Sequence, residues 1–265
     1  MQRNNEWNQW RTVAQPKEFL WHATTGKTWG TLDRDRFDFF NNRFFQSLCF
    51  AQDDFNGKAV LDIGAGSRLR SKFFRGAKIV VLDALADRYS KELAWSDIRD
   101  ADTIYSKSAE EFIPDLKGEI SLAMCINVLD HTYNPEQILR NVAEYLKPVG
   151  QVIVSVDLHD RADEMHPIGL NRSLLIAMVE RAGFTIERQY LGLPEKKAWG
   201  HGLAYSLVLS PKGKGMRRRR LFHLVIFKGF WTGLWRDFVE QSNRNLRRAF
   251  FHLIHTVLTV HRLLR

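Results

Sequence analysis

The stretch that decides the fold is residues 58–68, Lys-Ala-Val-Leu-Asp-Ile-Gly-Ala-Gly-Ser-Arg. A short apolar run that ends in glycines is typical of a buried parallel strand that breaks into a tight loop. Glycines serve where the backbone needs unusual dihedrals or where a ligand approaches the main chain closely. A helix is predicted over 67–75, with Arg68 exposed at its start; pairing of Arg68 with a carboxylate is the alternative. Strand, glycine loop and helix together predict the opening of a nucleotide-binding α/β unit.

A second apolar run, residues 78–83, also ends in a carboxylate. Asp83 follows Asp62 by 21 positions, close to the separation at which a doubly wound fold places the acid that binds ribose hydroxyls. The dinucleotide fingerprint would need a third small residue at position 69, and this chain has Leu69 there. We therefore expect an adenosine-type ligand without a pyrophosphate.

The remaining pattern predicts an alternation of strands and helices. Strands are expected at 59–63, 78–83, 103–107, 120–126, 151–156, 185–191 and 203–209, and helices at 34–50, 87–95, 135–146 and 173–181. Asn134 is the predicted N-cap of the third of these helices. In the first helix, Phe37, Phe40, Phe44 and Leu48 are expected to share one face.

These motifs resemble those of the class I S-adenosylmethionine-dependent methyltransferases. The resemblance rests on residues 60–66, Asp83, residues 108–112, residues 127–131 and residues 146–151, and it covers roughly residues 57–210. The ubiquinone/menaquinone-type branch, with relatives in bacterial glycan-biosynthesis clusters, is the most similar in its details. The resemblance implies a Rossmann-like, doubly wound, seven-stranded α/β fold with S-adenosyl-L-methionine as cofactor.

The resemblance also implies which residues bind the cofactor. Asp62 would hold the methionine amino group, Asp83 the ribose diol, and residues 108–110 the adenine ring. The full set of expected cofactor-binding residues is Asp62, Gly64, Ala65, Gly66, Asp83, Ala84, Ser108, Ala109, Glu110 and Asn127.

Two histidines are the candidates for chemistry on the acceptor. His131 follows the fourth strand and would act as a general base or orient the acceptor; a structural role in the next loop is the alternative. His166 follows the fifth strand and would contact the substrate. Near it lie His159 and several aspartates, but their spacing fits no standard ligand pattern, so we expect no metal.

Composition and charge divide the chain into three parts. We expect an N-terminal helical cover over 1–56, whose tryptophans either pack on the domain or line its pocket, the methyltransferase domain over 57–210, and an amphipathic helical tail over 211–265. Residues 212–265 carry 13 basic and two acidic residues, which leaves 26 basic and 28 acidic residues in the remainder. The two cysteines suggest no disulfides, the start shows no signal peptide, and no apolar run is long enough for a conventional membrane span. A cytoplasmic location is therefore expected.

Together these features predict a methyltransferase that O-methylates a small or lipid-linked carbohydrate at the inner face of a membrane. Its basic tail would bind the anionic membrane surface. The alternatives are C-methylation of a quinone precursor, a nucleic-acid methyltransferase that uses the basic tail, and an inactive cofactor-binding scaffold. The apolar face of the tail argues against nucleic acid as a partner. The oligomeric state is open.

Overall fold

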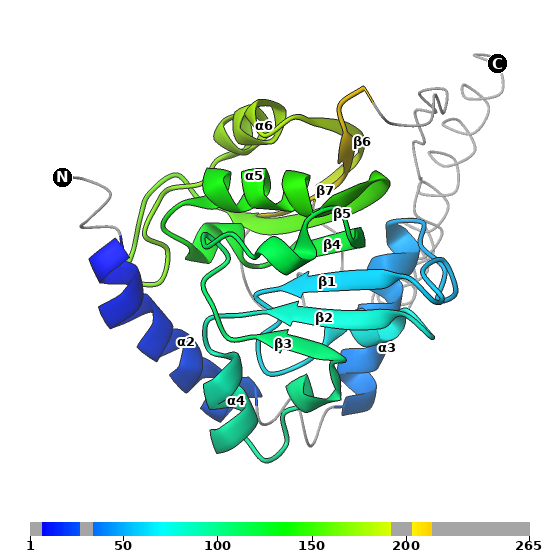
Figure 1. The fold of residues 1–265 in the computed structure, drawn as a ribbon. Coiled ribbons are helices and arrows are strands. Elements are labelled where there is room, and N and C mark those ends of the chain that lie inside the picture. The colour runs from blue at the N-terminus through cyan, green and yellow to red at the C-terminus, as the bar shows by residue number, and fades with distance from the viewer. Residues whose placement is uncertain (1–6, 27–33, 192–202, 214–265) are drawn as a thin grey trace, which may run out of the picture. The chain divides into compact units, whose positions relative to one another are not determined.

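The computed structural model describes residues 7–26, 34–191 and 203–213. Its centre is one seven-stranded sheet with the order β3-β2-β1-β4-β5-β7-β6 (Figure 1). The strands are β1 (Ala59–Ile63), β2 (Lys78–Leu82), β3 (Thr103–Tyr105), β4 (Ile120–Ile126), β5 (Leu146–Leu158), β6 (Phe184–Leu191) and β7 (Leu203–Pro211). This arrangement confirms the predicted doubly wound α/β fold.

The central position of β1 explains its sequence. It pairs in parallel with β2 along one edge and with β4 along the other. Because both faces of the sheet are also covered, Val60, Leu61 and Ile63 are all buried. At the far end of the sheet β7 pairs antiparallel with both β5 and β6. The chain reverses its strand order at β1, and the carboxyl ends of β1 and β4 form the crevice where such folds bind ligands.

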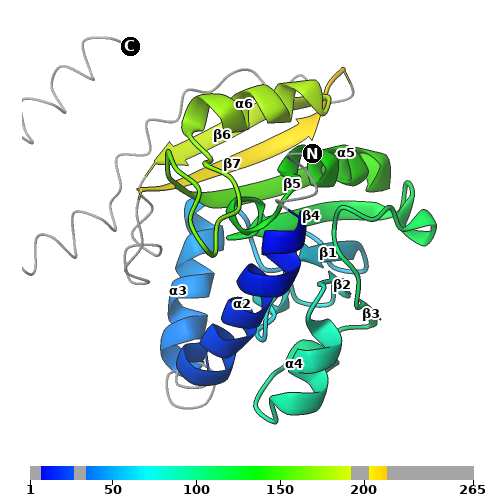
Figure 2. The same cartoon turned by 90° about the vertical axis from the view of Figure 1, so that its left-hand side faces the viewer.

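Helices cover both faces of the sheet. They are α2 (Gln15–Trp21), α3 (Arg34–Ser47), α4 (Ala86–Glu92), α5 (Pro135–Tyr145) and α6 (Arg172–Arg181). Two π-helical turns flank α2, η1 (Trp10–Ala14) and η2 (His22–Gly26), and short 3₁₀ turns are η4 (Arg70–Phe73), η5 (Ile98–Asp100), η6 (Pro114–Leu116) and η7 (Leu129–His131). Figure 2 shows α3 and α5 on opposite sides of the sheet.

The amphipathic pattern of α5 places it on the main core. Ile138 and Val142 lie on its apolar face and are fully buried against the sheet. The Asn134 side chain accepts a hydrogen bond from the Gln137 amide at 3.3 Å, which satisfies one free donor at the helix start. The N-cap prediction is confirmed.

The helix expected over 67–75 is wrong: only η4, a single 3₁₀ turn, forms there. The residues on either side of this turn, Leu69 and Phe74, have extended backbone. Asp97 Oδ1 accepts from the Leu69 amide at 2.8 Å and Asp62 Oδ2 accepts from the Ser71 amide at 3.1 Å. The expectation that Arg68 is exposed is also wrong. Its side chain is 7 % exposed, and its guanidinium lies 3.6 Å from the Asp97 carboxylate.

The aromatic residues of α3 join the core of the domain. Of the four residues expected on one face, Phe37, Phe44 and Leu48 are buried and Phe40 is half-buried. Phe45 is also fully buried, and its ring stacks on Phe73 of η4 with centroids 4.7 Å apart. The phenylalanines that follow the glycine loop therefore fill the space between the sheet and α3 instead of extending a helix.

The tail predicted over 211–265 lies almost entirely outside the described residues, which end at residue 213. A search of the helices that the structure does describe finds none with the length and apolar character to cross a membrane.

Candidate active site

Two adjoining cavities lie at the carboxyl ends of the central strands. The smaller has a volume of about 90 Å³ and the larger about 330 Å³. They share part of their lining, including Gly64 and Gly66 of the loop after β1, Asn127 and His131 after β4, and Glu18 of α2. One continuous site therefore extends from β2 towards the loop after β5.

The glycine loop has the backbone geometry that its sequence predicts. Gly64 and Gly66 have φ angles of +58° and +66°, in the left-handed region that side chains avoid. A Cβ atom on Gly64 would lie 2.6 Å from Val128, and one on Gly66 would lie 2.6 Å from the His22 ring. Because neither glycine has a side chain, Val128 of the loop after β4 and His22 of the N-terminal helical segment can pack directly against the glycine loop.

Two buried carboxylates accept hydrogen bonds from backbone amides in this loop and in the residues that follow it. Asp83 accepts hydrogen bonds from the Gly66 amide at 2.9 Å and the Leu85 amide at 2.7 Å, and it lines the smaller cavity. Asp62 accepts from Ser71 and lines neither cavity, so it would act on a ligand's ammonium group through water and not by direct contact. Burial raises the pKa of Asp83 and raises the pKa of Asp62 to about 6. An ammonium or hydroxyl donor at these carboxylates would favour their ionised forms.

The loop after β3 gives the smaller cavity a hydrogen-bond acceptor that has no donor. Glu110 and Ala109 line this cavity, whereas Ser108 does not, because its hydroxyl bonds to Glu110 Oε2. The other carboxylate oxygen, Glu110 Oε1, is buried without a partner among the described residues, and burial raises the pKa of this group. A donor such as the exocyclic amine of adenine would satisfy it. The cavity thus fits the adenosine part of S-adenosylmethionine.

The N-terminal helix contributes two polar residues that the sequence analysis did not identify. His22 Nδ1 lies 2.7 Å from Ser67 Oγ, and His22 Nε2 lies 3.2 Å from Glu18 Oε1. Burial alone would raise the pKa of Glu18, but the hydrogen bond to His22 and the nearby imidazoles of His131 and His166 lower it. The sequence could have indicated these two residues, because Glu18 and His22 are spaced i, i+4. Trp10 and Ala14, which precede them in the same helical segment, also line the site.

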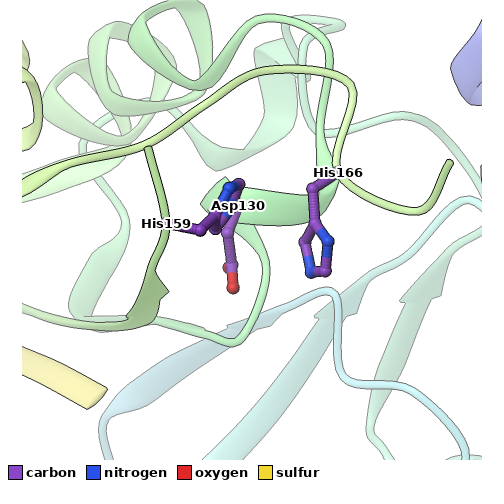
Figure 3. Close-up of side chains that lie close together, drawn as sticks. All are labelled: Asp130, His159 and His166. Carbon is purple, nitrogen blue, oxygen red and sulfur yellow. The ribbon is translucent and has the colours of Figure 1, made fainter. Parts of the chain in front are cut away.

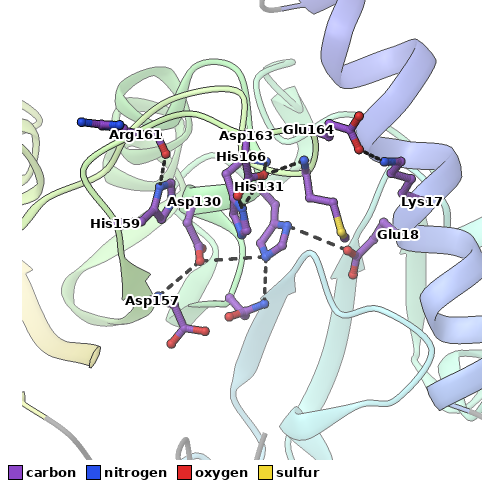
Figure 4. A network of polar contacts seen from close by, with 12 residues as sticks. Lys17, Glu18, Asp130, His131, Asp157, His159, Arg161, Asp163, Glu164 and His166 are labelled. Atoms are coloured by element: carbon purple, nitrogen blue, oxygen red, sulfur yellow. Dashed lines mark hydrogen bonds and ion pairs between the residues drawn. The ribbon is translucent and has the colours of Figure 1, made fainter. Parts of the chain in front are cut away.

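Three histidines form a row on the acceptor side of the site. His166 is central, with its ring centroid 4.4 Å from that of His131 and 4.6 Å from that of His159. Asp130 of η7 lies beside His159 and His166 (Figure 3). Figure 4 shows how further polar contacts connect this row to Glu18 of the N-terminal helix.

Most of the residues expected from the sequence meet in this site. The smaller cavity is lined by Gly64, Gly66, Asp83, Ala84, Ala109, Glu110, Asn127 and His131, and the larger adds Ala65 and His166. Asp62 and Ser108 lie behind this lining. Asn127 has a φ angle of +61°, an uncommon value for a residue with a side chain, and such strain concentrates at functional sites.

The comparisons with known proteins agree with this geometry. Residues 34–189 match the family described as "Methyltransferase domain". The ubiquinone biosynthesis O-methyltransferase of Dechloromonas aromatica (strain RCB) is 33 % identical over 106 residues, which cover 37 % of this chain and 44 % of that protein. Its counterpart in Pseudomonas paraeruginosa (strain DSM 24068 / PA7) is 30 % identical over 108 residues, with the same coverage. The match thus spans less than half the length of these relatives.

The solved structure of the mitomycin 7-O-methyltransferase MmcR has the same fold. Its TM-score is 0.51 at 19 % sequence identity, and the alignment covers 78 % of this chain and 60 % of that one. The family match extends over more than half of the chain, and its domain uses S-adenosylmethionine as the methyl donor. The chain therefore belongs to the methyltransferase domain family and is a class I S-adenosylmethionine-dependent methyltransferase.

Proposed function

We propose that this methyltransferase acts on a hydroxyl oxygen of a small or lipid-linked carbohydrate, with His131 as the group that accepts the proton. The observation that carries this proposal is the position of His131. Its side chain lines both cavities, so it lies where the cofactor side of the site meets the space for an acceptor. An imidazole is well suited to proton transfer near neutral pH.

The surroundings of His131 support a role in proton transfer. S-adenosylmethionine supplies a methyl group on a sulfonium, and the acceptor oxygen must lose its proton as the new C–O bond forms and the C–S bond breaks. Asn127 Nδ2 lies 3.0 Å from His131 Nε2, and Glu18 Oε2 lies 3.9 Å from Nδ1. The Asn127 amide orients the ring by donating to Nε2. Nε2 takes the proton once the acceptor hydroxyl replaces that amide as its hydrogen-bond donor, and the Glu18 carboxylate near Nδ1 stabilises the imidazolium that forms.

The aromatic lining of the larger cavity suits an acceptor with a ring. Trp21 and Phe37 line it from the N-terminal segment, and flat aromatic faces pack well against the apolar side of a sugar. The carbohydrate class itself rests on the resemblance and on the basic, amphipathic sequence beyond residue 213. That sequence favours an acceptor that is carried on a lipid at an anionic membrane surface.

A hydroxylated aromatic acceptor is the second candidate. The curated relatives are named as O-methyltransferases of ubiquinone biosynthesis, and a phenolic ring would also pack against Trp21 and Phe37. The names of these relatives favour oxygen over carbon as the methylated atom. A C-methylated quinone precursor therefore ranks below both.

An acceptor panel separates the candidates. We would incubate the full chain and S-adenosylmethionine with lipid-linked sugars, free sugars and polyprenylated dihydroxybenzenes, and identify any methyl ether by mass spectrometry and nuclear magnetic resonance. We expect a sugar methyl ether. Methylation of only the aromatic compounds would establish the second candidate, and a C-methylated product would overturn both.

The role of His131 has its own test. His131→Ala should lower the turnover number by about 10²–10⁴, the usual effect of losing a general base, while S-adenosylhomocysteine binds with unchanged affinity in a calorimetric titration. A turnover within a few-fold of wild type would show that orientation alone suffices and that His131 is not the base.

A further inference from the structure

Asp130, His159 and His166 form a cluster that methyl transfer, as described above, does not require. They come from three different segments, η7, the residue after β5, and the loop before α6 (Figure 3). Each offers a potential ligand atom, and these three atoms all lie within 4.8 Å of one another. Two imidazoles and one carboxylate on separate segments can approach a common point from different directions.

The cluster contains buried acceptor atoms without partners among the described residues. Asp130 is fully buried, and although its Oδ2 accepts from the Asp157 amide at 3.2 Å, its Oδ1 has no hydrogen bond. His159 Nε2 is likewise buried and without a partner. A buried acceptor without a hydrogen bond is destabilising, and a cation bound by this cluster would satisfy both residues.

Both histidines are oriented by a second contact through their other nitrogen. His159 Nδ1 lies 3.0 Å from the carbonyl oxygen of Arg161, so Nδ1 must carry the proton and Nε2 has a free lone pair. His166 Nδ1 lies 2.8 Å from both oxygens of Asp163, which requires the same tautomer. Imidazoles that bind metals are held in this way, with one N–H donated to a carbonyl or carboxylate.

The loop that carries both histidines is closed at its base. The His159 amide donates to the Leu170 carbonyl at 3.1 Å in an isolated β-bridge. Gly169 lies so close to the backbone of Asp160 that a Cβ atom there would be 2.5 Å from its carbonyl oxygen. The loop therefore presents the two rings from a defined backbone, as a metal site requires.

We propose that Asp130, His159 and His166 bind one divalent transition-metal ion. Two imidazoles and one carboxylate are the ligand set of open zinc and iron(II) sites, whereas Mg²⁺ and Ca²⁺ prefer oxygen ligands. The spacing of the histidines and aspartates after β5 fits no standard ligand pattern, so no metal was expected from the sequence. The three ligands lie 29 and 7 positions apart in the chain, and only the fold brings Asp130 to the histidine loop.

The site would face the acceptor. His159 and His166 both line the larger cavity, so three protein ligands leave coordination positions that open towards it. A bound cation lowers the pKa of a coordinated hydroxyl group, which would assist the proton loss to His131. This catalytic role rests on the proposed function, whereas binding of the metal does not.

Titration with Co²⁺ tests the binding itself. The full chain, stripped of metal by a chelator and dialysed, should bind one equivalent and develop visible absorption bands, and Zn²⁺ should displace the Co²⁺. His159→Ala and His166→Ala should each weaken binding by more than the roughly 10–100-fold that follows loss of an outer contact, and Asp163→Asn should weaken it within that range. Asp160→Asn is the matched control, because Asp160 is an exposed carboxylate in the same loop, and it should leave the titration unchanged.

Two outcomes would overturn the proposal: no Co²⁺ binding by the wild-type chain, or equal binding by the wild type and both histidine variants when circular dichroism shows all three folded. Binding that is independent of the loop would place the metal elsewhere. The proposed function fails separately, because it predicts a methyl ether product whether or not the stripped enzyme requires added metal.

Discussion

Asp62 is the residue whose chemistry depends most directly on the fold. Its carboxylate is 3 % exposed, and burial raises its pKa to about 6. The methionine ammonium group of the cofactor would favour the ionised form. Because the carboxylate is protonated below its folded-state pKa, the attraction is present above pH 6 and is lost as the pH falls through that value.

The affinity for S-adenosylhomocysteine should therefore depend on pH. We expect it to fall about tenfold between pH 7 and pH 5, since one pH unit below the pKa leaves about a tenth of the carboxylate ionised. Titration calorimetry at both pH values measures the change, and Asp62→Asn should show a much flatter profile. Equal slopes for the wild type and Asp62→Asn would show that Asp62 does not interact with the ammonium group.

Single residues of the glycine loop were predictable from the sequence because their requirements are local. Gly64, Gly66 and Asp83 are separated by one strand and one turn, and each has a backbone or charge role that few other residue types can perform. Glu110 was predictable only through the resemblance. Asp130 and His159 were not predicted as a pair, because nothing in their spacing indicates that η7 and the loop after β5 meet.

At the scale of elements, the N-terminal helix is the part that sequence patterns describe least completely. Its helical character and its role as a cover were expected, and Trp10 and Trp21 do line the cavities. The contact between His22 and Gly66 spans 44 positions and has no local signature. Conversely, the helix predicted over 67–75 is reduced to the turn η4, because Leu69 and Phe74 on either side of it have extended backbone.

The contact between η2 and the glycine loop can be measured by a double-mutant cycle. Gly66→Ala should lower the free energy of unfolding by about 1–2 kcal/mol through its positive φ and by about 1–3 kcal/mol more through overlap with the His22 ring. His22→Ala should recover much of the second part. Urea denaturation of the two single variants and the double variant gives the coupling.

Gly118→Ala is the control for that cycle. Gly118 has a similar φ of +72°, but no atom lies within 4 Å of the position that a Cβ atom would take there. Its substitution should therefore show only the backbone cost and no coupling to His22→Ala. If Gly66→Ala and His22→Ala are simply additive, the helix does not press on the loop as the structure indicates.

At the scale of the whole molecule, the unequal distribution of charge separates the domain from the sequence that follows it. The domain accounts for the cofactor site, and residues 216–265 account for most of the basic excess. We expect the full chain to float with vesicles that contain anionic lipid and much less with neutral vesicles, and moderate salt should weaken this binding because it screens the attraction.

A truncated chain provides the comparison for the vesicle experiment. Deletion of residues 216–265 should abolish flotation and leave a folded domain that still binds S-adenosylhomocysteine, since every described element lies before residue 214. Equal flotation of both chains, or a truncated chain that aggregates, would show that the tail is not a separable membrane anchor.

The central claim is that the cavities at the end of β1 and β2 bind S-adenosylmethionine through Asp83. Calorimetric titration with S-adenosylhomocysteine tests it most directly, with Asp87→Ala as a control for an exposed carboxylate on α4. We predict binding in the micromolar range for the wild type and Asp87→Ala, and a loss of about 10- to 150-fold for Asp83→Ala, because a hydrogen bond to a charged group contributes about 1.5–3 kcal/mol. Unchanged affinity in a folded Asp83→Ala variant would contradict the account.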